Sequence, residues 1–64
     1  MDEEIFNMSM RKFLKEVGVT SQQQIETAVR KSGKTSGRIP VRMVLTAEAI
    51  GLEHVVTGEI GLGG

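Results

Sequence analysis

Five large apolar residues near the start of the chain recur at helical spacing. They are Phe6, Met10, Phe13, Leu14 and Val17. Because these positions follow i, i+4, i+7, i+8 and i+11, they fall within an arc of about 100° on a helix. Gly18 comes directly after them, and glycine is a typical helix end. The pattern predicts an amphipathic helix over residues 3–17.

A second helical pattern follows that glycine. Thr20 or Ser21, each with a glutamine three residues later, fits a capping box that would satisfy the first free backbone donors of a helix. The apolar face is short and consists of Ile25, Ala28 and Val29. Gly33 is a suitable stop. We expect a second helix over residues 21–32, packed on the first.

The apolar period changes from 3.6 to 2 after a polar linker, residues 33–38. We expect strands over residues 39–46 and 52–61, joined at residues 47–51 by a turn or a short helical loop. The alternation places Val41, Met43 and Leu45 on one face of the first strand, and Leu52, His54, Val56, Gly58, Ile60 and Leu62 on one face of the second. Pro40 suits the first residue of a strand.

Length and composition limit the core that such elements can build. Sixty-four residues make a single domain, 1–64, with only two Phe, no Trp, no Tyr and no Cys. A chain of this size buries only about 60% of the surface that its unfolded form exposes. Since disulfides and Cys-based zinc sites are excluded, self-association is the stabilising device that remains. We predict an α+β fold in which two N-terminal helices precede a C-terminal β-hairpin, completed as a four-stranded sheet in a homodimer.

The predicted dimer contact lies on the apolar strand faces, because an isolated hairpin is marginal in water and one short helix pair covers little of it. The candidate contact residues are Val41, Met43, Leu45, Leu52, Val56 and Ile60. The linker from Ser32 to Arg38 contains two glycines, so a domain swap between the two copies is a possible form of this dimer.

Charge is distributed unevenly although the net charge is zero. Residues 1–29 sum to −2, residues 30–42 to +5 and residues 43–64 to −3. The basic residues Arg30, Lys31, Lys34, Arg38 and Arg42 are candidates for contact with a polyanion or with a partner protein. Two helices followed by a hairpin is also the order of a small winged helix-turn-helix, so a weak nucleic-acid-binding module is the alternative function. The acidic flanks argue against it, and neither nucleic acid nor a membrane is an expected partner.

A phosphate-binding loop is suggested by Gly33-Lys34-Thr35 and then rejected. The position five residues before that glycine is Ala28, and the predicted order of helix, loop and strand is the reverse of a P-loop. We therefore expect no nucleotide and no other cofactor.

Catalytic and metal-binding patterns are not found in the sequence. His54 is the only histidine, and Glu53 beside it falls on the opposite strand face. We predict no metal site, no catalytic residues and no enzymatic activity. The sequence "GLGG" at residues 61–64 resembles the tail of ubiquitin-like carriers, but those proteins open with a strand hairpin, so a carrier is a lesser alternative.

The segments "IFNMSMRKFLKEVGVTSQQQIETAVR" and "GLEHVVTGEI" resemble a family of short uncharacterised bacterial proteins catalogued only as a domain of unknown function. The similarity spans most of the chain. It implies a bacterial source and an α+β domain, and it brings no activity, cofactor or catalytic residue. Because apolar runs are short and the chain opens with acidic residues, we expect a soluble cytoplasmic protein. The molecular function stays unknown at this point; we expect a small non-catalytic structural or protein-interaction module that acts as a homodimer.

Overall fold

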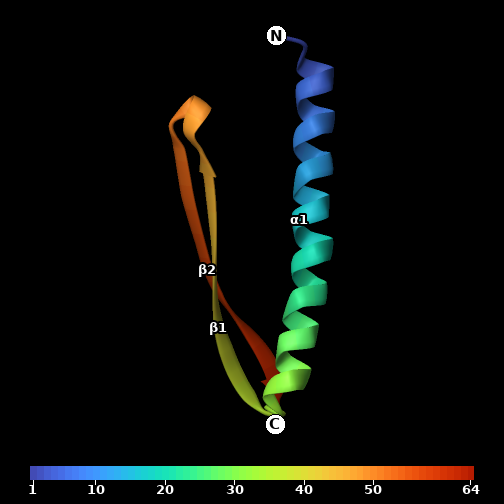
Figure 1. The fold of residues 1–64 in the computed structure, drawn as a ribbon, viewed down its shortest axis with the longest axis vertical. Helices are drawn as coiled ribbons and strands as arrows, with labels where there is room; N and C mark the ends of the chain where they lie inside the picture. Colours follow the sequence, from blue (N-terminus) through green and yellow to red (C-terminus); the bar gives the residue numbers. More distant parts are fainter. The chain divides into compact units, whose positions relative to one another are not determined.

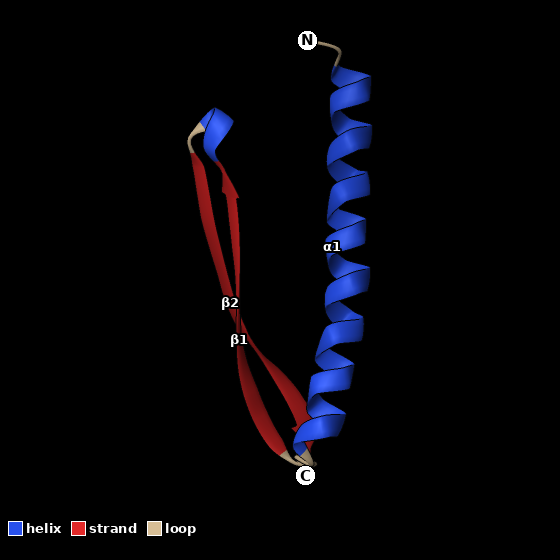
Figure 2. Cartoon of the chain, viewed as in Figure 1, coloured by secondary structure: helices blue, strands red, loops and turns tan.

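The structure, a computed structural model, describes residues 1–64 and contains one long helix followed by a hairpin (Figures 1 and 2). The elements in chain order are α1 (Glu3–Ser32), β1 (Gly37–Ala47), a short 3-10 helix (Glu48–Ile50) and β2 (Leu52–Gly63). The predicted α+β class is confirmed. The chain divides into a helical unit, Met1–Gly33, and a hairpin unit, Lys34–Gly64.

The prediction of two helices is wrong, because α1 continues through Gly18 as a single helix of 30 residues. Gly18 does not have the positive φ of a helix-ending glycine. Keeping glycine inside a helix costs only about 1 kcal/mol, whereas a break would leave up to eight backbone groups without helical partners. Thr20 does not cap a new helix; its hydroxyl donates to the Glu16 carbonyl at 2.8 Å, one turn back.

The correction also removes the winged helix-turn-helix order. That motif needs a turn between two helices so that the second can enter a groove of the nucleic acid. Here the predicted turn around Gly18 is helical. The alternative of nucleic-acid binding then depends on basic residues alone.

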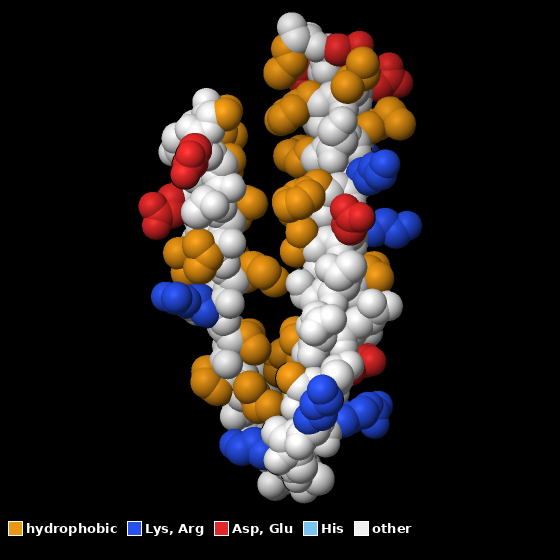
Figure 3. All heavy atoms as spheres, in the orientation of Figure 1, with side chains coloured by type: hydrophobic (Ala, Val, Ile, Leu, Met, Phe, Trp, Pro, Cys, Tyr) orange, Lys and Arg blue, Asp and Glu red, His pale blue; other side chains and the backbone are white.

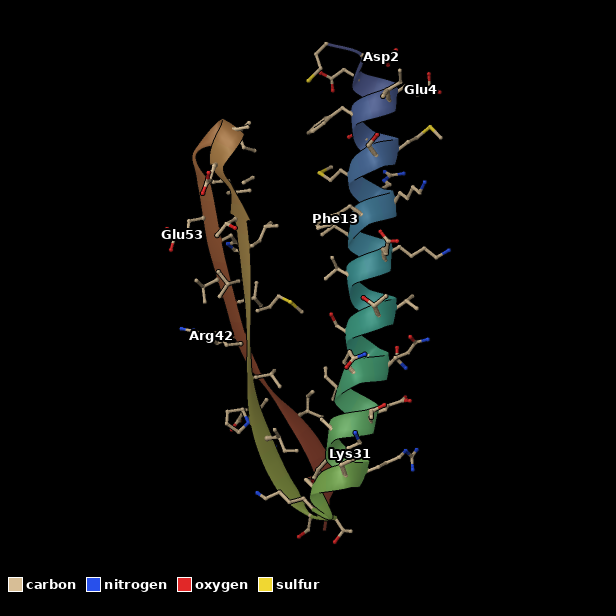
Figure 4. The ribbon with its side chains drawn as sticks, viewed as in Figure 1. Asp2, Glu4, Phe13, Lys31, Arg42 and Glu53 are labelled. Atoms are coloured by element: carbon tan, nitrogen blue, oxygen red, sulfur yellow. The ribbon has the colours of Figure 1, made fainter.

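Asp2 determines where α1 begins. Its backbone is extended, and its Oδ1 accepts hydrogen bonds from the amides of Glu4 at 3.0 Å and Ile5 at 3.1 Å. These are two of the donors that the first helical turn leaves without partners. Figure 4 shows Asp2 and Glu4 together at this end of the helix. The carboxylates of Glu3 and Glu4 also complement the positive end of the helix dipole.

Gly33 ends the helix, as predicted, in the left-handed conformation with φ of 74°. Glycine adopts this conformation without the steric penalty of a Cβ. Arg30 and Lys31 lie in the last turn, where positive charge complements the negative end of the dipole. Lys31 is labelled there in Figure 4.

The hairpin is antiparallel, and its register pairs Val44 with Val55 and Met43 with Val56. The short helix at residues 48–50 makes the connection that the sequence predicts at 47–51. Gly51 closes it with φ of 63° and donates its amide to the Glu48 carbonyl at 3.1 Å. The strands are slightly longer than the predicted 39–46 and 52–61.

A register shift interrupts the far end of the hairpin. Arg38 pairs with Gly61, whereas Gly37 pairs with Gly63, so Leu62 is an extra residue on β2. Such a bulge increases the local twist. Protection still alternates through it, since Ile60 and Leu62 are half-buried whereas Gly61 and Gly63 are exposed. That Leu62 shares the face of Ile60 stays a prediction.

Neither unit has a buried core, and no side chain of the chain is fully buried. The most protected apolar residues are half-buried, among them Val17, Ile25 and Val29 of the helical unit and Ile39, Val41 and Leu45 of the hairpin unit. No helix of the chain combines the length and hydrophobicity that crossing a membrane requires.

Candidate interaction site

The hairpin carries one apolar face, which we call the hairpin apolar face. Cross-strand partners point to the same side of a sheet and alternate residues point to opposite sides. From the observed register this face consists of Ile39, Val41, Met43, Leu45, Ala47, Leu52, His54, Val56, Gly58 and Ile60. All six residues predicted for a dimer contact lie on it. The face is exposed to solvent, since Met43 is 43% exposed and Val56 is 52% exposed.

Two apolar members of this face, Ile39 and Ala47, are absent from the predicted contact set, as are His54 and Gly58. Ile39 and Ala47 are half-buried and lie toward opposite ends of β1. The signal was available in the sequence, because both continue the period-2 alternation of Val41, Met43 and Leu45. Ala47 lies just outside the predicted strand, which ends at residue 46, whereas Ile39 lies inside it and was left out of the contact set alone.

The opposite face of the hairpin is mostly polar. It carries Arg38, Arg42, Glu53 and Glu59, and Figure 4 shows Arg42 and Glu53 extending from the same side. Arg38 Nη1 lies 3.5 Å from Glu59 Oε1, with side chains 73% and 56% exposed. An ion pair this exposed contributes little stability, but it partly neutralises Arg38.

The helical unit carries a second apolar surface, which we call the α1 stripe. It contains the five predicted residues Phe6, Met10, Phe13, Leu14 and Val17 and continues, because the helix is unbroken, to Ile25 and Ala28. Figure 3 shows hydrophobic side chains along one side of α1. Phe13 is 50% exposed and Leu14 is 54% exposed. The stripe therefore lacks a cover over its large residues.

The predicted basic segment is divided between the two units. Arg30 and Lys31 end α1, Lys34 lies in the connection, and Arg38 and Arg42 share the polar face of β1. The two strand arginines share one face and are four residues apart, with Pro40 between them on that side. Arg30 and Lys31 belong to the helical unit, so neither unit alone contains all five basic residues.

Residues suggested by other motifs occupy simple structural positions. Gly33, Lys34 and Thr35 follow the negative end of α1, whereas phosphate sites use the positive end of a helix. His54 pairs with Leu45 on the hairpin apolar face. The chain has no group of three or more His, Cys, Asp or Glu side chains placed to hold a metal ion.

The glycine tail is part of the hairpin unit up to its end. Gly63 pairs with Gly37, and a Cβ on Gly64 would lie 3.0 Å from the Cβ of Ser36. A carrier needs its terminal glycines in an extended, accessible tail. Here Gly63 and Gly64 lie beside the start of β1. The carrier alternative stays a prediction.

Comparison with known proteins adds the family. The chain matches no curated protein and no solved structure. A family model described as "Family of unknown function (DUF6494)" matches residues 1–63, almost the whole chain. The resemblance seen in the sequence is thereby confirmed. The chain belongs to this family of unknown function.

Proposed function

We propose that the protein is a small non-catalytic interaction module that acts as a homodimer. The observation that carries the proposal is the presence of two apolar surfaces, the hairpin apolar face and the α1 stripe, in a chain with no buried side chain. Water-exposed apolar surface of this extent marks an association site in soluble proteins.

The dimensions of the elements favour a partner over a single copy. Two strands about 4.8 Å apart make a ribbon roughly 10 Å wide, which is also the diameter of one helix. A single helix laid on one ribbon has solvent on both sides, so it can bury none of its stripe completely. Two hairpins joined edge to edge make a four-stranded sheet that two helices cover side by side.

Neither unit covers its own apolar surface. α1 is the only element of the helical unit, and β1 and β2 of the hairpin unit pair only with each other. A second copy is the partner always present at matching concentration, and it offers the same two apolar surfaces.

In this proposal the polar face of the hairpin is the surface offered to another protein. Arg38, Arg42, Glu53 and Glu59 lie on the side of the sheet opposite the hairpin apolar face. Exposed arginine is enriched in protein interfaces. Because two arginines and two glutamates share this face, it suits a partner protein whose surface carries charges of both signs.

Sedimentation equilibrium at about micromolar concentration tests the homodimer. We expect a species of twice the chain mass of 7.0 kDa, with helix and strand signals in circular dichroism at the same concentration. A chain that is folded by circular dichroism and sediments as a monomer would contradict the proposal.

A domain swap is a specific form of this dimer. The connection from Gly33 to Gly37 contains a glycine at each end, both with positive φ, and such a hinge allows the hairpin of one copy to cover the helix of the other. Inter-chain NOEs in a mixed labelled sample distinguish the forms. Contacts of Phe13 or Val17 with the hairpin that appear only between differently labelled chains support the swap, and contacts only within one chain exclude it.

A further inference from the structure

The two outer edges of the hairpin differ in their suitability for pairing with another strand. β1 contains a proline, Pro40, between Arg38 and Arg42. β2 contains no proline, and its central residues are Val55, Val56, Thr57 and Gly58. Apart from the bulge at Leu62 near its end, β2 offers a long edge on which every residue has an amide, and such an edge is a template for pairing.

Pro40 interrupts the outer edge of β1. Proline has no amide hydrogen, and sheets accommodate it where the missing donor faces outward. Pro40 is paired with Glu59 inside the hairpin. The donor is therefore missing from the edge where a further strand would bind, and charged side chains near it add to the protection.

Two-fold symmetry provides an independent reason why a second copy would not pair along the outer edge of β1. A two-fold axis pairs a strand with its copy in antiparallel order, and the two strands overlap over their full length only when the axis lies at the strand centre. The centre of Gly37–Ala47 is Arg42, so pairing through β1 would set Arg42 against the same arginine of the second copy. Like charges directly opposite each other destabilise a sheet.

A two-fold axis at the centre of β2 does not bring like charges opposite each other. The uncharged Thr57 lies next to the centre of the regular part of β2, before the shift at Leu62. With Thr57 opposite its own copy, Glu53 of one copy lies opposite Gly61 of the other, and Glu59 lies opposite Val55. Neither glutamate faces a glutamate.

We infer that the second copy joins along the outer edge of β2, giving the strand order β1–β2–β2–β1 with Thr57 opposite its own copy at the two-fold axis. The inference rests on the homodimer proposed above and names the edge through which it forms. Because the axis is perpendicular to the sheet, the hairpin apolar faces of both copies become one continuous surface.

Disulfide trapping with two matched variants tests the edge. The chain has no cysteine, so a single introduced cysteine can form only a disulfide between copies. Thr57 and Arg42 are direct cross-strand partners on the same face. In the inferred order two residues at position 57 are neighbours, whereas two at position 42 lie about 14 Å apart, three strand spacings. A disulfide needs Cα atoms within about 7 Å.

Both variants, Thr57→Cys and Arg42→Cys, are oxidised at about 10 μM, and linked dimer is measured on a non-reducing gel. We expect Thr57→Cys to link on the order of 100-fold faster, since pairing raises the local thiol concentration to millimolar. Thr57 is exposed, so a cysteine of similar size is not expected to prevent folding. Val44→Cys, on the same face of β1, replaces Arg42→Cys if that variant does not fold by circular dichroism.

The possible results distinguish the inferred β2 edge from the proposed homodimer on which it rests. A sedimentation dimer whose position 42 links faster, or whose two positions link equally slowly, overturns the β2 edge and leaves the homodimer in place. A folded monomer in sedimentation overturns both. Faster linking at position 57 in a sedimentation dimer supports both.

Discussion

Val55 and Val56 are adjacent in β2 and nearly equally exposed, at 47% and 52%, yet they lie on opposite faces of the hairpin. Val56 pairs with Met43 on the hairpin apolar face, and Val55 pairs with Val44 on the polar face. The two residues therefore form a natural matched pair for asking which face is covered in the assembled protein.

We expect Val56→Lys to weaken dimerisation by about 100-fold or more, because it places a charge without a partner in a dry interface. Val55→Lys should change the dimer dissociation constant by less than about threefold, since that side chain stays in water. Sedimentation equilibrium of both variants over a range of concentrations gives the two constants. Equal effects of the two substitutions would mean that the hairpin apolar face is not the contact.

Gly18 and Gly33 allow a test of the continuous helix. A Cβ on Gly18 meets nothing within 4 Å, and its backbone is helical, so Gly18→Ala should stabilise the protein by about 1 kcal/mol. Gly33→Ala should destabilise it by about 1 kcal/mol, because alanine resists the left-handed conformation. Urea denaturation followed by circular dichroism measures both. A destabilising Gly18→Ala would indicate that the chain turns at residue 18 after all.

Removal of the Asp2 cap should loosen the start of α1. Asp2→Ala deletes the acceptor of two amides and should cost about 1 kcal/mol. Asp2→Asn keeps an acceptor oxygen and is the matched control, with a loss of only a few tenths of a kcal/mol. Amide hydrogen exchange at Glu4 and Ile5 is the local readout; unchanged exchange rates in Asp2→Ala would show that the cap has no role in solution.

Duplex DNA should bind weakly at physiological salt, with a dissociation constant above about 1 μM. The basic residues are divided between the two units, and Arg38 lies beside Glu59. Fluorescence anisotropy with a labelled duplex in about 0.15 M salt measures the affinity. A tighter complex that weakens and loses salt dependence in the Lys34→Ala, Arg38→Ala double variant would restore the nucleic-acid alternative.

The hairpin was predictable from the sequence because each of its features has a local cause. Alternation of Val41, Met43 and Leu45 determines the face, and a glycine at position 51 permits the backbone that closes the connection. The faces of both strands then follow from a period of 2. Only the register shift near Leu62 was not predicted, because a bulge among closely spaced glycines does not change the pattern of apolar and polar residues in the sequence.

The helix break at Gly18 could not be decided by local reasoning. Glycine at the end of an apolar stripe, followed by Thr20 and Ser21, has the pattern of a stop and a new start. The same residues are tolerated inside a helix when flanking turns on both sides supply hydrogen bonds, as the Thr20 to Glu16 bond illustrates. The continuous helix and the helix broken at Gly18 differ in free energy by about a few kcal/mol. The hydrogen bonds of the neighbouring turns contribute a free energy of similar size, so they decide between the two.

The connection at residues 48–50 has a consequence for how fast the protein matures. The paired residues of the hairpin enclose this connection, so we expect the strands to zip outward from it. Each helical bond joins neighbours one turn apart. Contacts of such short sequence separation form in microseconds. Assembly of two chains is instead a bimolecular encounter, so its rate rises with protein concentration. Refolding monitored by stopped flow should therefore show a fast phase that is independent of concentration and a slower phase that accelerates as more chain is added.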